Sequence, residues 1–387
     1  NTNRRNPIIA IRAFSEDPER AAHLTASYVS LAEDSGLLTT AKHFPGHGDT
    51  HQDSHDSLPS VLKSLDELRA CELLPFQAAI DAGCSLVMTA HVAFPQIDPS
   101  GLPATLSPLL LKKLLRDEMG FEGVVCSDSL LMAGVRDLFD NEGVMALAAL
   151  NAGVDLLLDV KDPVAVVDHL VLSVANGSLT NDRVNEAFDR IRKLKSKVFD
   201  RTPVTQPTLR GLPVEMTDEQ FAILSANTAA REAVEITGDT GGVLPLDPDR
   251  PLIAILLKPF ETAIDPPEQP LAAALRARFR DVRYIELGPR TDAAALDAAR
   301  QRALAAEQLV VAMIVRPAAW HAFGLLAPQA EFVRQLTAAR PAIVASLGVP
   351  HALDDYPAAA VRICMYSDVA VSQQALADVL LADRPAR

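Results

Sequence analysis

The first half of the chain alternates short apolar runs with segments whose apolar residues recur every three or four positions. Apolar runs of strand length predict five strands, at residues 7–11, 37–42, 85–90, 123–127 and 154–158. Amphipathic segments predict helices between them, at about residues 17–34, 64–83, 107–120, 141–151, 162–175 and 181–198. Strands that are apolar along most of their length and alternate with helices are typical of a parallel sheet covered by helices.

Local signals support the predicted helices. Ser64 followed by Glu67 is a capping box, and Ser107-Pro108 combines an N-cap residue with proline at the first helical position. The helix at residues 17–34 is expected to bury one apolar stripe, formed by Ala21, Leu24, Tyr28 and Leu31.

Five strands are compatible with a doubly wound sheet but not with a complete (β/α)8 barrel, which needs eight strands and roughly 250 residues. A barrel would need about three more strand–helix units before residue 1. The chain begins Asn1-Thr2-Asn3 without methionine and reaches an apolar run within six residues. We therefore expect that the sequence is a fragment cut at both ends.

The second half of the chain predicts another α/β domain. Residues 201–215 contain Pro203, Pro207 and Pro213 among polar residues, which is typical of a linker. Thr217 opens the next predicted helix, with Gln220 at the capping-box position. Further strands are predicted at residues 252–257, 282–285, 309–314, 342–346 and 361–365. The expected organisation is a domain at 1–200, a linker at 201–215 and an open α/β domain at 216–387.

Composition and charge exclude several classes of protein. With 36 basic and 50 acidic residues the net charge is −14, and no basic cluster offers a surface for duplex nucleic acid or an anionic membrane. No apolar run reaches the roughly 18 residues of a transmembrane helix. The four cysteines show no CxxC spacing, and three lie in apolar runs, which predicts small buried side chains.

The densest polar stretch, residues 42–55, directly follows a predicted strand. Its four histidines are spaced by four residues, as on one face of a metal-binding helix: His43, His47, His51 and His55. Pro45, Gly46 and Gly48 interrupt any such helix and predict a loop instead. A zinc hydrolase and a polar surface loop stay as alternatives. A long loop at the carboxyl end of a strand is where α/β proteins place their sites.

Two acidic residues, Asp128 and Asp53, also indicate a site at the carboxyl ends of the strands. Asp128 ends an otherwise apolar strand, where a partly buried carboxylate acts as a nucleophile or base, or as a helix N-cap. In Asp53-Ser54-His55, the carboxylate of Asp53 can hydrogen-bond the ring of His55 and raise its pKa. That pair suits general acid/base work.

These segments resemble the motifs of family 3 glycoside hydrolases and, within them, the β-N-acetylglucosaminidase (NagZ-type) branch. The motifs are Lys42-His43-Phe44-Pro45-Gly46-His47-Gly48-Asp49-Thr50 with Asp53-Ser54-His55, and Gly123-Val124-Val125-Cys126-Ser127-Asp128-Ser129-Leu130. Supporting segments are Asn6-Pro7-Ile8-Ile9, Arg12-Ala13-Phe14, Glu16-Asp17-Pro18, Leu74-Pro75-Phe76, Met88-Thr89-Ala90-His91-Val92 and Pro103-Ala104-Thr105-Leu106-Ser107. They follow the family's order over residues 1–200. The second half is loosely similar to the family's α/β sandwich domain.

The resemblance implies a fold and a set of roles. The fold is a (β/α)8 TIM barrel, with its N-terminal strands missing here, followed by an open α/β sandwich. The implied catalytic residues are Asp128 as nucleophile, His55 as general acid/base and Asp53 as its partner. The implied substrate contacts are Arg12, Lys42, His43 and, at the pocket wall, His91. Lys42 beside the site would favour the ionised form of Asp128.

The implied activity is that of a retaining exo-β-N-acetylglucosaminidase. Its partner is a carbohydrate, terminal N-acetylglucosamine of peptidoglycan fragments or chitin oligosaccharides, without metal or organic cofactor and without nucleic acid. Two-domain relatives are often exported, which favours the cell envelope or exterior and leaves the cytoplasm open. A neutral imidazole repels an incoming anion less than a carboxylate does, so the choice between water and phosphate as glycosyl acceptor stays open.

The chain departs from the family pattern in places. Ala13 replaces the serine of the usual Arg-Ser-Phe segment, and Ser129 follows the nucleophile where an aspartate is frequent. No residue can be assigned to the Asp and Arg that the family carries on its early strands. A family 3 β-glucosidase or β-xylosidase is a rival, although these typically have tryptophan after the nucleophile and the one tryptophan here is Trp320. A non-catalytic sugar-binding protein is the other rival, against which the intact Asp128, Asp53 and His55 argue.

Overall fold

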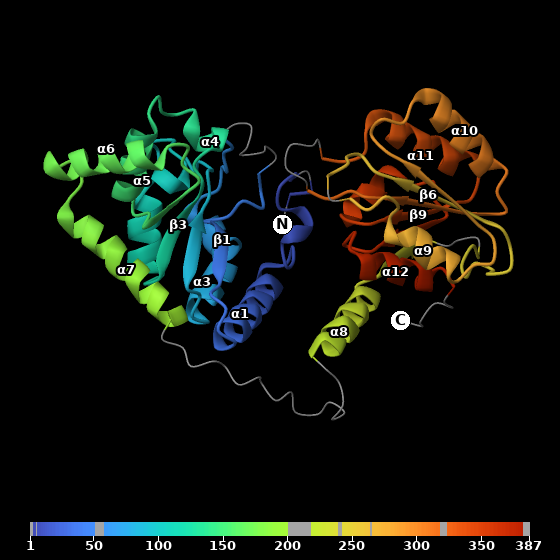
Figure 1. The fold of residues 1–387 in the computed structure, drawn as a ribbon, viewed down its shortest axis with the longest axis horizontal. Coiled ribbons are helices and arrows are strands. Elements are labelled where there is room, and N and C mark those ends of the chain that lie inside the picture. The colour runs from blue at the N-terminus through green and yellow to red at the C-terminus, as the bar shows by residue number, and fades with distance from the viewer. Residues whose placement is uncertain are drawn as a thin grey trace. The chain divides into compact units, whose positions relative to one another are not determined.

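The structure is a computed structural model of the 387-residue chain. It describes residues 3–4, 6–50, 58–199, 218–238, 242–263, 265–317 and 323–381. The chain forms two compact units, Asn1–Leu209 and Arg210–Arg387, each of which is described by itself (Figure 1). The predicted linker at 201–215 lies outside the described residues.

The first unit contains a parallel sheet whose spatial order equals its chain order, β1-β2-β3-β4. The strands are β1 (Thr40–Phe44), β2 (Leu86–Thr89), β3 (Val124–Ser129) and β4 (Leu156–Leu158). The helices are η1 (Ala10–Arg12), α1 (Pro18–Asp34), α2 (Leu65–Ala70), α3 (Leu73–Asp81), η2 (Ala104–Leu106), η3 (Leu109–Glu118), α4 (Ala133–Arg136), α5 (Glu142–Ala152), α6 (Pro163–Ala175) and α7 (Asn181–Phe199). Because neighbouring strands are parallel, their carboxyl ends meet at one edge of the sheet.

The predicted strand at residues 7–11 is wrong, because this segment bends and enters the 3₁₀-helix η1. The side-chain oxygen of Asn6 accepts hydrogen bonds from the backbone N–H groups of Ile8 and Ile9, at 3.0 and 2.6 Å. Ala10 then adopts a φ of 40°, which no extended strand allows. An Asn side chain that bonds its own backbone competes with strand formation in this way.

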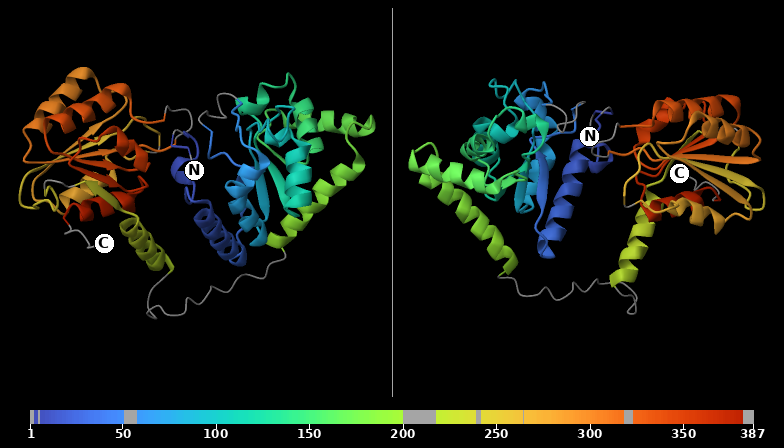
Figure 2. Two further views of the ribbon diagram at one scale, coloured as in Figure 1. Left: turned by 180° about the vertical axis from the view of Figure 1, so that it is seen from behind. Right: turned by 45° about the horizontal axis from the view of Figure 1, so that its top comes forward.

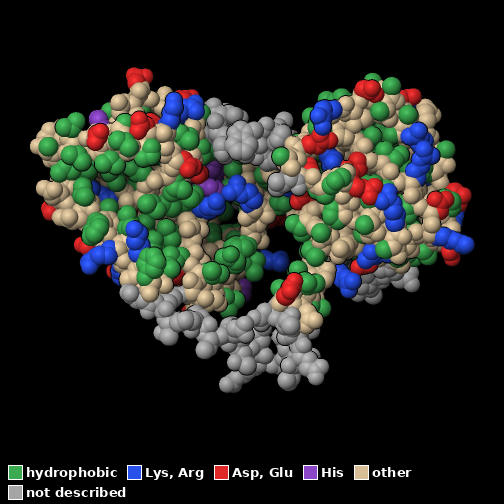
Figure 3. All heavy atoms as spheres, in the orientation of Figure 1, with side chains coloured by type: hydrophobic (Ala, Val, Ile, Leu, Met, Phe, Trp, Pro, Cys, Tyr) green, Lys and Arg blue, Asp and Glu red, His purple; other side chains and the backbone are tan. Residues whose placement is uncertain are grey.

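The other predicted elements of the first unit are confirmed, with changes at their ends. Asp17 caps α1, and the capping box of Ser64 and Glu67 is present on α2. The predicted helix at 64–83 is two helices, α2 and α3. The expected burial of the α1 stripe is wrong for Tyr28 and Leu31, whose residues are 61% and 70% exposed. Figure 3 shows hydrophobic side chains on the visible face of this unit.

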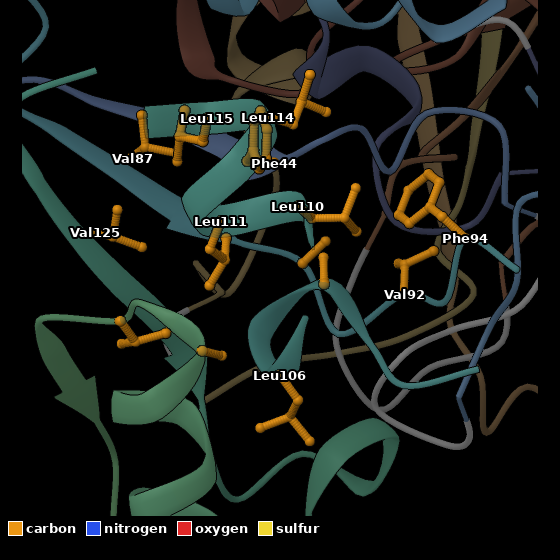
Figure 4. Close-up of a cluster of buried hydrophobic side chains, with 14 of the residues drawn as sticks. Phe44, Val87, Val92, Phe94, Leu106, Leu110, Leu111, Leu114, Leu115 and Val125 are labelled. Atoms are coloured by element: carbon orange, nitrogen blue, oxygen red, sulfur yellow. The ribbon is translucent and has the colours of Figure 1, made fainter. Parts of the chain in front are cut away.

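Helix packing against the sheet forms the core of the first unit (Figure 4). η3 is a π-helix, and it buries one apolar face against β2 and β3. Side chains from strands, loops and η3 interdigitate in this core: Phe44, Val87, Val92, Phe94, Leu106, Leu110, Leu111, Leu114, Leu115 and Val125. Packing of this kind fixes the strands as a rigid platform for the loops that follow them.

Asp155, which directly precedes β4, joins several elements through buried ion pairs. Its side chain is 0% exposed and lies 2.8 Å from Arg116, 2.8 Å from Arg183 and 3.0 Å from Arg190. It also accepts a hydrogen bond from the backbone N–H of Val125 on β3, at 3.0 Å. One carboxylate therefore holds η3, β3 and α7 at the amino ends of the strands.

The second unit is a sheet in the order β5-β10-β9-β8-β6-β7, with helices on both of its faces (Figure 2). All five strands predicted here are confirmed: β6 (Leu252–Leu257), β7 (Val282–Leu287), β8 (Gln308–Met313), β9 (Ile343–Ser346) and β10 (Val361–Cys364). The edge strand β5 (Glu235–Gly238) was not predicted; it pairs antiparallel with β10. The helices are α8 (Asp218–Glu232), α9 (Pro270–Arg276), α10 (Ala293–Leu304), α11 (Ala327–Ala339), η4 (Pro350–Asp355) and α12 (Ala370–Val379). The predicted cap Thr217 lies outside the described residues.

The cysteines behave as predicted for buried side chains. Cys84, Cys126 and Cys364 are buried, Cys71 is half-buried, and all four are free thiols. Burial raises the pKa of Cys126 and Cys364 to about 12, so both stay protonated at neutral pH. Among the helices that the structure describes, none is long and apolar enough to cross a membrane.

We expect Asp155→Ala to lower the free energy of unfolding by about 3–5 kcal/mol, because it leaves buried arginines without their counter-charge. Urea unfolding followed by circular dichroism measures the change. The matched control is Asp189→Ala, which removes an exposed pair with Arg192 and should change stability little. Equal losses in the two variants would contradict a structural role for the Asp155 cluster.

Candidate active site

Polar side chains meet at the carboxyl ends of β1, β2 and β3. Lys42 and His43 lie near the end of β1, His91 follows β2 by two residues, and Asp128 is the penultimate residue of β3. Chain order and spatial order are the same for these strands, so each residue comes from the neighbour of the last. The sheet therefore brings together four of the site residues that the sequence predicts.

The Asp128 carboxylate lies between one backbone N–H group and one imidazole. Its Oδ1 accepts a hydrogen bond from the N–H of Ser129, at 2.8 Å. Its Oδ2 lies 3.5 Å from Nε2 of His43, and the Asp128 side chain keeps 23% of its surface exposed. The carboxylate is thus held on one side and open on the other, which is the state that a nucleophile requires.

His43 is a neutral ring at ordinary pH. Burial lowers the pKa of His43 well below its usual value, and the neighbouring groups His47, Lys42, Arg12 and His91 lower it further. Among the described residues, its Nδ1 has no hydrogen-bond partner and is shielded from solvent. Its ring packs edge-on against His47, with ring centroids 5.7 Å apart.

The loop at residues 45–50 is attached to the first segment of the chain by Asn6. Asn6 is 0% exposed. Its Nδ2 donates to the carbonyl of His47 at 2.7 Å and to the carbonyl of Thr50 at 2.8 Å. Its Oδ1 accepts from the N–H groups that precede η1. Asn6 therefore connects the segment that leads to Arg12, at the end of η1, with the loop that contains His47. The Nη1 of Arg12 donates to the carbonyl of Ile8 at 3.1 Å.

A second attachment holds the loop from the α2–α3 side. Lys63 lies 2.5 Å from Glu72 and 3.1 Å from Asp49. Burial opposes the charge of Lys63, but the bonds to Glu72 and Asp49 raise its pKa above the usual value. Glu72 also backs Gly46, where an added Cβ would lie 2.7 Å from the Glu72 Cγ at a φ of +147°. Only glycine fits that position.

A cavity of about 640 Å³ opens beside β1 in the first unit. Its polar end is lined by Arg12, Lys42, His43, His47 and Glu72, and its apolar wall by side chains of α1, including Tyr28 and Val29. The cavity therefore shares three of the predicted substrate contacts. Asp128 does not line it.

The remaining predicted site residues are Asp53, His55 and His91. Asp53 and His55 lie in 51–57, outside the described residues. His91 is 1% exposed, and both of its ring nitrogens bond protein groups, which leaves no ring atom for a sugar hydroxyl. Within the described part of the chain, no three His, Cys, Asp or Glu side chains form a group that could hold a metal ion.

Sequence reasoning did not single out Asn6, Lys63, Glu72 or Thr105. Asn6 and Thr105 occur in segments that support the family resemblance, but nothing in their spacing indicates a contact. Glu72 lies in the predicted helix at 64–83 and Lys63 directly precedes it, where charges are ordinary. The roles of the four residues follow from contacts across 9 to 44 positions of the chain, which a pattern of neighbours does not encode.

Comparisons with known proteins bear on the family and the fold of the chain. The model of the glycosyl hydrolase family 3 N-terminal domain matches residues 1–194. A solved family 3 β-N-acetylglucosaminidase from Paenibacillus sp. str. FPU-7 is 30% identical with a TM-score of 0.86, over 98% of this chain and 72% of that one. The chain belongs to glycosyl hydrolase family 3. The expected fold class, an α/β domain of the TIM-barrel kind followed by an α/β sandwich, is thereby confirmed.

Two curated relatives of the chain are named beta-hexosaminidases. Beta-hexosaminidase A of Pseudoalteromonas piscicida is 33% identical over 277 residues, which are 66% of this chain and 45% of that protein. The beta-hexosaminidase of Stenotrophomonas maltophilia (strain K279a) is 47% identical over 157 residues, 40% of this chain and 45% of that protein. The chain thus spans just under half the length of these relatives. A solved β-glucoside phosphorylase, 22% identical with a TM-score of 0.82, shares the fold.

We expect the free energy of unfolding of the first unit to decrease as the pH falls below about 6.5. Burial lowers the pKa of both His43 and His91 in the folded state, so the unfolded chain binds protons there before the folded chain does. Stability is therefore lost as the pH falls from the ordinary histidine pKa toward the lower folded values. Urea unfolding at pH 7.5 and 5.5 should show that the free energy of unfolding decreases less in His43→Asn than in the parent. The control is His23→Asn, at an exposed position of α1, which should lose as much as the parent.

Proposed function

We propose that this protein hydrolyses terminal β-linked N-acetylglucosamine with retention of configuration, using Asp128 as the nucleophile. The observation that carries the proposal is the Asp128 carboxylate at the carboxyl end of β3, held by Ser129, open on one side and facing neutral His43. A retaining glycosidase needs an anionic nucleophile next to the anomeric carbon and a proton donor beside the leaving oxygen.

In the first step, an oxygen of Asp128 attacks the anomeric carbon as the bond to the leaving group breaks. His43 Nε2 can donate a hydrogen bond to the carboxylate or to a sugar hydroxyl without adding a net charge. Lys42 and Arg12, which line the neighbouring cavity, supply positive donors for further hydroxyls. These contacts orient the sugar over the carboxylate.

The second residue of the mechanism is His55, with Asp53 as its partner. Protonated His55 gives its proton to the leaving oxygen, and the neutral ring then takes a proton from the water that releases the sugar from Asp128. Asp53 favours the protonated ring and fixes its orientation. The attachments of loop 45–50 by Asn6 and Lys63 support this role, since the segment with Asp53 and His55 continues directly from that loop.

The substrate class rests on relatives of family 3. The relatives that are named as beta-hexosaminidases, and the solved β-N-acetylglucosaminidase, support N-acetylglucosamine as the sugar. The neighbours named as β-glucosidases are 19–20% identical and support only the fold. Peptidoglycan fragments or chitin oligosaccharides are the glycans we propose.

Asp128→Asn should lower kcat/KM on an aryl N-acetyl-β-glucosaminide by about a thousandfold or more, because an amide cannot form the glycosyl ester. The control is Asp137→Asn, an exposed residue of the same unit, which should keep the parent rate. Activity of Asp128→Asn within about tenfold of the parent would refute the nucleophile assignment. Faster turnover of an aryl glucoside than of the N-acetylglucosaminide by the parent would refute the substrate.

His55→Ala should slow an alkyl or sugar leaving group by about 10²–10⁴-fold, the usual contribution of general acid/base catalysis. A dinitrophenyl leaving group needs no proton, so its first step should be nearly unaffected. Values of kcat/KM, which report the first step, separate these cases when measured on the two substrates. An equal loss of kcat/KM on both would assign His55 to another role.

A further inference from the structure

Three buried side chains connect the end of β2 to the end of β3. They are Thr89, the last residue of β2, His91 two positions later, and Thr105 in η2. Their exposures are 0%, 1% and 0%. The Thr89 and Thr105 hydroxyl oxygens are 2.8 Å apart, Thr105 Oγ1 lies 2.7 Å from His91 Nδ1, and His91 Nε2 lies 2.9 Å from the carbonyl oxygen of Ser129.

The chemistry of the groups fixes the direction of these hydrogen bonds. The carbonyl of Ser129 can only accept, so Nε2 of His91 carries the proton. Burial lowers the pKa of His91, against the attraction of Asp128 and the bond to Ser129, so the ring is neutral and its Nδ1 accepts. The hydroxyl of Thr105 therefore donates to His91 and accepts from Thr89. Thr105 Oγ1 also lies 3.1 Å from the Ala90 carbonyl, which competes for the same proton.

The Thr89–Thr105–His91 relay acts on the β2 side of β3, where the backbone ladder has ended, whereas on the β4 side pairing resumes at Ser129 and Leu158. The β2–β3 pairing ends at Met88 and Cys126, and the β3–β4 pairing is irregular between Cys126 and Ser129. Asp128 lies in that gap. On the β4 side, the N–H of Leu158 bonds the Ser127 hydroxyl at 2.9 Å. On the β2 side, the contact is His91.

We propose that His91, oriented by Thr105, is a positioning residue that holds the backbone of Ser129 through its carbonyl and thereby aims the carboxylate of Asp128, and that it does not bind the sugar. The inference rests on the proposed function, because the carboxylate that it positions is the proposed nucleophile. The link is short, since the N–H of Ser129 bonds Oδ1 of Asp128 and the carbonyl of Ser129 bonds His91.

Thr105→Val tests the relay, because valine has a similar shape and no hydroxyl. We expect kcat to fall roughly ten- to hundredfold, the cost of a misaimed catalytic group, while KM stays within about twofold. Thr105→Ser restores the hydroxyl and should restore kcat. Thr337→Val, a buried threonine of the second unit bonded within its own helix, is the control. A rise in KM with unchanged kcat, or loss in both Thr105 variants alike, would overturn the proposal.

Two measurements do not depend on activity, so failure of the relay and failure of the proposed function can be told apart. Long-range ¹H–¹⁵N spectra, with the His91 signals assigned from His91→Asn, should show protonation at Nε2. The ¹³C carboxyl signal of Asp128, assigned from Asp128→Asn, should shift in Thr105→Val and not in Thr105→Ser or Thr337→Val. A proton on Nδ1, or an unmoved Asp128 signal, would overturn the relay whether or not the parent cleaves a glycoside.

Discussion

Parallel pairing in chain order is the constraint on which the site depends. Strands β1, β2 and β3 lie side by side and run in the same direction, so their carboxyl ends are about 4.8 Å apart from strand to strand. Residues more than 35 positions apart in the chain thereby become neighbours. His43, His91 and Asp128 meet because the sheet places them there, and the buried Asp155 cluster joins η3 and α7 to the amino ends of β3 and β4.

The same constraint explains what could be predicted from sequence. Apolar runs and helix caps predict β1 to β4 and the five parallel strands of the second unit, because each of these signals is local. The segment at residues 7–11 shows the limit of this reasoning. It has the composition of a buried strand, yet the side chain of Asn6 binds its N–H groups and bends it toward η1. A side chain that competes with the ladder does not change the hydrophobic pattern.

The site was predictable as a set of residues but not as a set of contacts. Lys42, His43, Asp128 and Arg12 were expected from motifs, and the structure puts them at one edge of the sheet or around one cavity. The sequence also suggested His91 as a pocket wall, whereas its ring is enclosed by protein groups. The orientation of His91 toward the Ser129 carbonyl depends on its hydrogen bond to Thr105 in η2, which lies 14 residues further along the chain.

The neutral state of His43 has a consequence for the electrostatics of the site. A ring that stays uncharged through the physiological pH range presents the carboxylate with a constant dipole rather than a variable charge. The carboxylate of Asp128 therefore meets an uncharged ring on its His43 side, and that ring neither attracts nor repels a bound molecule by net charge.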